Sequence, residues 1–105
     1  MRSAGLLHLT NSQLAQILGI SASSVSRLVA GERQMDPESK EGELGLLLVR
    51  LYRSLDAMVG GDSDLRMTWL TSNNRALNGP PLELITSTSG LVNTVAYLDS
   101  ARARL

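Results

Sequence analysis

Two short apolar stripes around a glycine constrain the fold of this chain more than any other feature. Within residues 10–33, Ala15 stands where two helices would cross, Gly19 lies in the turn between them, and Val25 lies on the second helix. A helix-turn-helix needs a small residue at the helix crossing, a glycine in the turn and a branched apolar residue on the second helix. Apolar residues also occupy the flanking places: Leu14, Leu18, Ile20 and Leu28. The spacing predicts a helix-turn-helix, with a plain helical hairpin as the alternative.

The ends of these two helices have their own sequence markers. Thr10 or Asn11 can cap the first helix and Ser21 the second, because their side-chain oxygens accept free backbone N–H groups. Gly19 is expected to leave the first helix at positive φ. The buried side of the second helix is predicted to consist of Val25, Leu28 and Val29.

The outward side of the second helix is a candidate DNA-binding face. At about 100° per residue, the side opposite Val25 presents Ser23, Ser26, Arg27 and Ala30. An arginine can contact a guanine edge or a phosphate, and serines bond either with little selectivity. Each serine alone is better explained as solvated surface, but with Arg27 the set favours a groove. The candidate DNA-binding residues are Ser21, Ser23, Ser26 and Arg27.

Positive charge is thin for a DNA-binding protein. The net charge is zero: residues 1–35 carry three Arg and one Glu, residues 36–64 seven acids and three bases, and residues 65–105 four Arg and two acids. Phosphate neutralisation supplies most non-specific affinity for DNA. We therefore expect several copies to combine their contacts within a complex, since linked sites raise the overall affinity.

A long central helix is predicted after the turn at residues 31–37. Asp36 would cap it, Pro37 would take its first position, and it would run to about Val59, with Gly42 and Gly45 weakening its first turns. Its buried stripe is predicted to be Leu44, Leu47, Leu48, Leu51, Leu55 and Met58.

The far side of this central helix carries aliphatic residues next to arginines. Leu46 and Val49 lie there beside Arg50 and Arg53. This arrangement indicates either a protein interface or isolated surface apolar residues, and the two interpretations have equal weight.

Short helices are predicted for the remainder of the chain. Asp62 or Ser63 would cap a helix over residues 64–73, with Leu65, Trp69 and Leu70 as its apolar residues and Trp69 in the core. Pro81 would open a short helix, and a last helix over 90–104 would bury Leu91, Val95 and Leu98. The fold class is all-α, divided into residues 1–35, a connecting helix over 36–61, and a small helical domain over 62–105.

Residue types and spacings argue against several classes of protein. His8 is the single histidine and cysteine is absent, so we expect no metal site, no disulfide and no nucleophilic catalytic pair. No glycine-rich turn has the form of a phosphate loop. The longest apolar run is too short for a membrane span, and no signal peptide is recognisable. We expect a cytoplasmic binding protein that is not an enzyme and holds no cofactor.

The segment from Trp69 to Asp99 resembles the toxin-binding domain of Xre/MbcA/ParS antitoxins. The resemblance rests on Trp69, Asn74, the turn Leu77-Asn78-Gly79, the run Pro81-Leu82-Glu83-Leu84, and Gly90 before an amphipathic helix. Residues 10–33 look like the Xre-like helix-turn-helix of the same antitoxins.

This resemblance implies a function and its partners. Members are prokaryotic antitoxins, most often paired with a RES-domain toxin that degrades NAD⁺. The C-terminal region covers the toxin's NAD⁺ cleft, and the complex represses its own operon. The resemblance thus implies a RES-domain toxin and operator DNA as partners, with self-association in the complex. The toxin-binding residues would include Tyr97, Arg102, Arg104 and Leu105.

Arg102 falls on the same stripe as Leu98 but is too costly to bury unpaired. Either the last helix frays before it, or the helix projects beyond its domain and Arg102 meets the toxin. Two other functions stay open: a stand-alone repressor without a toxin, and an antitoxin whose helix-turn-helix does not bind DNA.

Overall fold

The protein is an assembly of helices around one long helix. The computed structural model describes residue 5 and residues 7–103. Its helices are α2 (Asn11–Leu18), α3 (Ala22–Val29), α4 (Lys40–Val59), α5 (Ser63–Thr71), α6 (Pro81–Leu84) and α7 (Thr88–Ala103). The described residues contain no strand, only an isolated antiparallel bridge between Asn74 and Gly79. The all-α class is confirmed. None of the described helices has the length and apolarity that a bilayer crossing requires.

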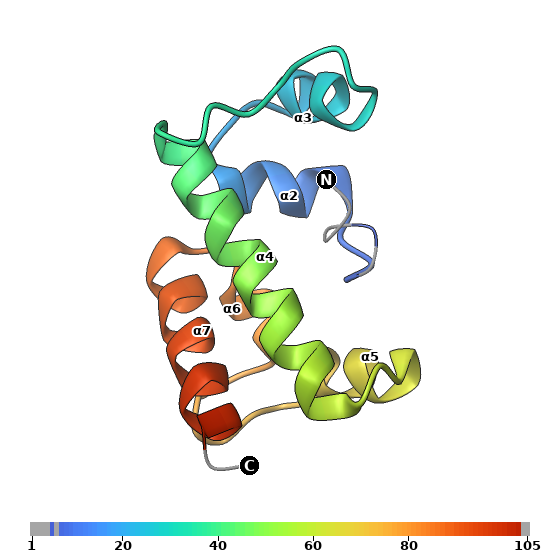
Figure 1. Ribbon diagram of the computed structural model, residues 1–105, viewed down its shortest axis with the longest axis vertical. Helices are drawn as coiled ribbons and strands as arrows, with labels where there is room; N and C mark the ends of the chain where they lie inside the picture. The colour runs from blue at the N-terminus through green and yellow to red at the C-terminus, as the bar shows by residue number, and fades with distance from the viewer. Residues whose placement is uncertain (1–4, 6, 104–105) are drawn as a thin grey trace.

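The central helix α4 connects the two ends of the molecule (Figure 1). Its twenty residues span about 30 Å, against a longest dimension of 39 Å for the whole protein. α2 packs against α4 and carries α3, whereas α7 runs along α4 farther down and α5 meets its end. The short α6 contacts both α5 and α7. Residues far apart in the sequence therefore meet along α4.

A single aliphatic core runs through both ends of the protein. It consists of Leu7, Leu14, Ile17, Leu18, Val25, Leu48, Leu51, Leu55, Leu70, Ile85, Leu91, Val95 and Leu98. The predicted stripes of α4 and α7 are confirmed, since their central residues are buried and Leu44, Leu47 and Met58 pack against the core. Because the chain has no Phe, leucines fill most of this space.

The predicted ends of the first two helices are confirmed. Thr10 accepts a hydrogen bond from the backbone N–H of Gln13, whose side chain accepts from Thr10 in return. Gly19 leaves α2 at φ 68°, and the hydroxyl of Ser21 caps α3. These local signals fix where each helix begins and ends.

The predicted start of α4 at Asp36 is wrong. Ser39 is the capping residue, and its hydroxyl accepts from the N–H of Gly42 at 3.0 Å. The carboxylate of Asp36 instead accepts from the N–H of Glu38 at 2.9 Å, within a turn that contains Pro37. A local turn between an Asp and the second residue after it competes with helix capping. The helix therefore begins three residues after the predicted position.

Gly42 and Gly45 permit close packing on α4. A Cβ atom on Gly42 would lie 2.0 Å from the backbone oxygen of Asp36, and one on Gly45 would lie 2.6 Å from the sulfur of Met35. The glycines lower intrinsic helix propensity, as the sequence indicates. Their larger consequence is that residues 35–37, which precede α4, can pack directly against the backbone of the helix.

Two predicted core positions, Val29 and Trp69, differ from the structure. Val29 is 56% exposed, because α3 packs chiefly against α2 and only Val25 and Leu28 point that way. Leu65 is also exposed, and Trp69 is only half-buried. Arg66 takes the inward side of α5, where it donates to Asp56 at 2.9 Å.

Candidate functional site

One candidate site is the exposed face of α3, at the end of the molecule opposite α5 (Figure 1). The four residues predicted to contact DNA, Ser21, Ser23, Ser26 and Arg27, are all exposed. The sequence folds this way because Val25 is fully buried against α2, which turns the polar residues of the same helix outward. We call Ser21, Ser23, Ser24, Ser26 and Arg27 the serine face.

A hydrogen-bond network joins the residues of the serine face. The hydroxyl of Ser21 accepts from the backbone N–H of Ser24 at 3.1 Å and donates to the Ser24 hydroxyl at 2.9 Å. Its oxygen also lies 3.1 Å from that of Ser23. Ser21 therefore acts first as a helix cap, and its hydroxyl is already engaged before any ligand arrives.

Ser24 belongs to this face although sequence reasoning did not select it. Its hydroxyl accepts from the Arg27 guanidinium at 3.2 Å while it accepts from Ser21. The three residues are three positions apart, which places them on neighbouring turns of one helix face. That spacing is visible in the sequence and was the available signal. Ser24 holds the guanidinium of Arg27 along the face.

Available positive charge on the helix-turn-helix is small. Residues 10–33 contain two arginines, Arg27 and Arg33. Arg33 is in an ion pair with Glu41 of α4, whereas the guanidinium of Arg27 donates to the neutral hydroxyl of Ser24. One copy of the serine face therefore presents one cation suited to a phosphate or a guanine edge.

The last helix includes Arg102, one of the predicted toxin-binding residues. α7 runs to Ala103, so it does not fray before Arg102. Arg102 is exposed, and its guanidinium donates to the hydroxyl of Ser54 on α4 at 3.4 Å. The expectation that Arg102 stays out of the core is confirmed. Arg104 and Leu105 lie outside the described residues.

Tyr97 does not share a surface with Arg102. Five residues along a helix turn the side-chain direction by about 140°. Tyr97 is half-buried and stacks on Trp69 of α5, with ring centroids 6.4 Å apart and planes inclined by 22°. Trp69 also lines a hollow of about 370 Å³ together with Met58 and Leu65. The structure thus separates the predicted toxin-binding residues into two regions.

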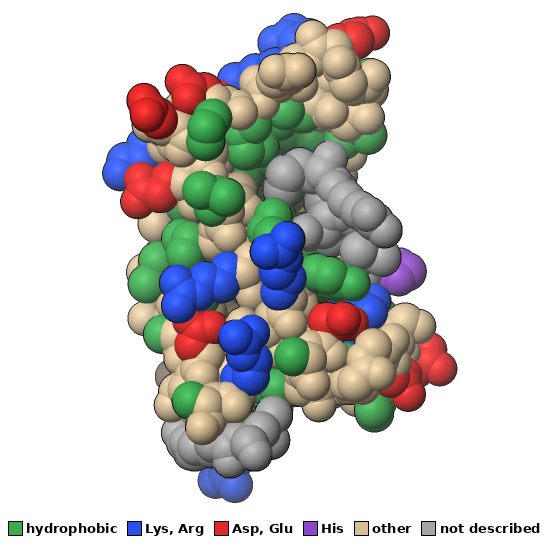
Figure 2. All heavy atoms as spheres, viewed as in Figure 1, with side chains coloured by type: hydrophobic (Ala, Val, Ile, Leu, Met, Phe, Trp, Pro, Cys, Tyr) green, Lys and Arg blue, Asp and Glu red, His purple; other side chains and the backbone are tan. Residues whose placement is uncertain are grey.

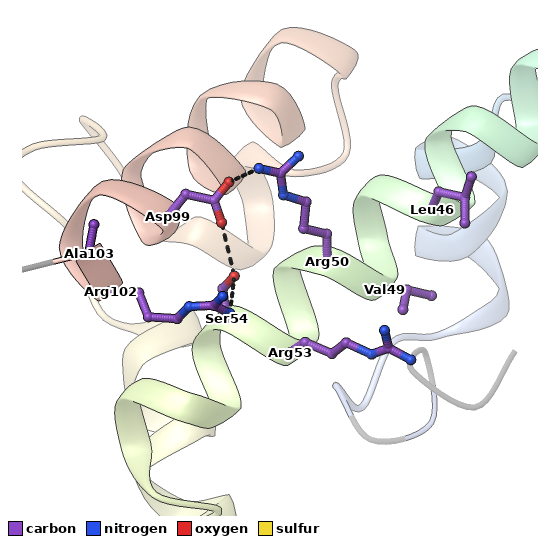
Figure 3. A pocket seen from close by; sticks show the side chains of 8 residues that line it. All are labelled: Leu46, Val49, Arg50, Arg53, Ser54, Asp99, Arg102 and Ala103. Atoms are coloured by element: carbon purple, nitrogen blue, oxygen red, sulfur yellow. Dashed lines mark hydrogen bonds and ion pairs between the residues drawn. The ribbon is translucent and has the colours of Figure 1, made fainter. Parts of the chain in front are cut away.

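A larger groove lies between α4 and α7 (Figure 3). Its volume is about 630 Å³ and we call it the arginine groove; its lining residues are Leu46, Val49, Arg50, Arg53, Ser54, Asp99, Arg102 and Ala103. Figure 2 shows basic side chains gathered over α4 and α7 in the same region. The far side of α4 proposed from the sequence as an interface forms one wall of this groove.

Among the residues that the structure describes, Asp99 is the one acidic residue lining the arginine groove. Its carboxylate accepts from the guanidinium of Arg50 and, at 3.0 Å, from the hydroxyl of Ser54. Arg53 extends from α4 away from Asp99 (Figure 3). Three arginines against one aspartate leave two positive charges in excess in the groove. The described residues contain no cluster of His, Cys, Asp or Glu arranged to hold a metal ion.

Comparison with known families assigns both ends of the chain. Residues 1–50 match the family described as the antitoxin Xre-like helix-turn-helix domain. Residues 54–104 match the antitoxin Xre/MbcA/ParS C-terminal toxin-binding domain. Comparison with curated proteins gave no match. The two matched ranges meet within α4, so the serine face lies in the first and the whole α7 wall of the arginine groove lies in the second.

Proposed function

The chain belongs to the Xre/MbcA/ParS antitoxin family, and from this premise we propose that it neutralises a RES-domain toxin that degrades NAD⁺. The C-terminal end covers the active-site cleft of the toxin, and the resulting complex binds operator DNA to repress its own transcription. The observation that carries this proposal is the order of the two matched domains along one chain. In this proposal the protein acts in the cytoplasm as a binding protein that holds no cofactor and catalyses no reaction.

The helix-turn-helix contributes the DNA-binding part of this function. Ser21, Ser23, Ser26 and Arg27 share one exposed face, which is the geometry that a recognition helix needs in a major groove. Because each serine face has a single cation without an acidic partner, one copy is expected to bind DNA with modest affinity. The affinity rises when several copies associate in the complex. The proposed division assigns DNA binding to residues 1–35, connection to 36–61 and toxin binding to 62–105.

The C-terminal end contributes the toxin-binding part. An arginine is suited to a cleft that binds an anionic dinucleotide, because its guanidinium pairs with carboxylates or occupies a phosphate position. Arg102 is exposed near the end of α7, and Arg104 and Leu105 follow it in the sequence. These residues form one proposed contact with the toxin, and Tyr97, on another side of α7, forms a second.

Deletion of residues 101–105 tests this proposal. The deletion leaves the buried residues of α7 up to Leu98 in place, so the truncated chain is expected to fold. We expect it to bind operator DNA normally but to rescue growth poorly when a RES-domain toxin is co-expressed. Circular dichroism provides the folding control, and the double substitution Arg102→Ala with Arg104→Ala tests the arginines alone. Full rescue by the truncated chain would contradict the proposed role of the C-terminus.

A further inference from the structure

The arginine groove continues into an apolar hollow along α4. The hollow has a volume of about 210 Å³, and its lining residues are Met35, Pro37, Gly42, Gly45, Leu46 and Val49. Leu46 and Val49 line both surfaces, and Leu46 is 61% exposed. The combined surface from Gly42 to Ser54 is about 18 Å long at helical rise. It is apolar at one end and cationic at the other.

The charges at the cationic end are incompletely satisfied within the protein. Arg50 keeps a side-chain exposure of 62% although it pairs with Asp99. Arg102 donates to the neutral hydroxyl of Ser54 at the long distance of 3.4 Å. Arg53 extends away from Asp99, the one acid among the described lining residues of the groove. Guanidinium groups of this kind are suited to paired hydrogen bonds with carboxylates.

We propose that this combined surface docks a segment of the toxin that carries carboxylates beside apolar side chains. The proposal rests on the proposed function, because it identifies the toxin as the occupant. Charge complementarity favours an acidic segment, since the groove has an excess of two positive charges. The apolar hollow next to it favours aliphatic side chains at one end of the same segment. The groove also combines α4 with residues of the matched toxin-binding domain.

Nucleic acid fits this surface less well. Asp99 lies within the groove, and exposed aliphatic side chains occupy its adjoining end. Protein–DNA interfaces are more polar and much more positively charged than this. The groove also lies along α7, whereas the serine face belongs to α3, which packs chiefly against α2. The toxin is thus the occupant that the charge and the apolar surface support together.

Arg53→Glu tests the proposal with little risk to the fold, because Arg53 is exposed. Affinity for the RES-domain toxin is measured by titration calorimetry at two salt concentrations. We expect Arg53→Glu to weaken binding roughly tenfold or more and to reduce its salt dependence, because it puts an acid opposite the acidic segment. The matched control is Lys40→Glu, an equal change of charge at an exposed residue of α4 that lies outside both the groove and residues 62–105. We expect this control to bind like the unaltered chain.

Each other result has a definite meaning. Equal affinities for both variants and the unaltered chain, or equal losses in both variants, would overturn the groove while leaving the proposed function intact. Loss of operator binding by Arg53→Glu alone would make DNA the occupant. A dimer of the unaltered chain in sedimentation, abolished by Arg53→Glu, would make a second copy the occupant. Failure of the unaltered chain to bind the toxin would overturn the proposed function, and the groove's occupant with it.

Discussion

The serine face and the arginine groove are built in opposite ways. The serine face comes from consecutive residues 21–27 of one helix and its cap. The arginine groove joins residues 46–54 of α4 to residues 99–103 of α7. The first requires only that α3 forms and turns Val25 inward, whereas the second requires the tertiary packing of two helices. One surface is therefore local, and the other depends on the whole fold.

The two surfaces also differ in chemistry. The serine face consists of hydroxyl groups bonded to one another, with Arg27 as its one cation. The arginine groove concentrates three guanidinium groups around one carboxylate. A chain with zero net charge thus places its basic groups away from the face expected to read DNA. This difference agrees with the two proposals, in which charge attracts the protein partner and several copies together bind operator DNA.

The largest expected effect is loss of both surfaces through the core that they share. Leu51 on α4 is fully buried in the cluster that extends from α2 to α7. We expect Leu51→Ala to lower the free energy of unfolding by about 2–5 kcal/mol, because it leaves a cavity between packed helices. Urea denaturation followed by circular dichroism measures this change.

Operator binding and toxin binding should then be lost together as the temperature is raised. Loss of toxin binding at a temperature where operator binding persists would show two independently stable halves. That result would contradict the conclusion that both ends of the protein share one core along α4.

The sequence predicts the local surface well and the assembled surface only in part. The positions of Gly19, Ser21 and Val25 follow from turn, capping and burial rules that act within a few residues. The α4 wall of the groove was visible as Leu46 and Val49 beside arginines. That Asp99 and Arg102 complete this groove could not be predicted. The spacing of residues in the sequence does not show which turn of α7 packs against Ser54.

The errors in the sequence predictions have one local cause and one tertiary cause. Asp36 and Ser39 are both good capping residues, and the turn at Pro37 decides between them. Trp69 was predicted to lie in the core, but it is only half-buried, and Arg66 takes the inward position of α5. Its guanidinium reaches Asp56 and lies 5.2 Å from the centre of the Tyr52 ring. Such a pairing depends on neighbours that are distant in the sequence.

A smaller effect is expected at Arg27, and it sharpens the contrast between the two surfaces. We expect Arg27→Ala to weaken operator binding by about 1–3 kcal/mol per copy, because it removes the only cation of the serine face. Affinity for the toxin should stay unchanged, since Arg27 lies outside the arginine groove. Fluorescence anisotropy with operator DNA measures the loss, and Arg75→Ala serves as the control. Unchanged operator affinity would remove Arg27 from the DNA-binding site.

The smallest effect is expected at Ser24, whose role is to position Arg27. Ser24→Ala removes the oxygen that accepts from the guanidinium at 3.2 Å but leaves the backbone N–H that Ser21 caps. The expected loss of operator affinity is about 0.5–1.5 kcal/mol, the usual contribution of one hydrogen bond. If Ser24 acts through Arg27, Ser24→Ala has no further effect when Arg27→Ala is already present. Thermal unfolding of the unaltered chain, the two single variants and the double variant provides the control. It would reveal any loss of helix stability caused by damage to the Ser21 cap. Additive losses in the cycle would mean that Ser24 contacts DNA itself, and the serine face would then read its operator through hydroxyl groups more than through its one cation.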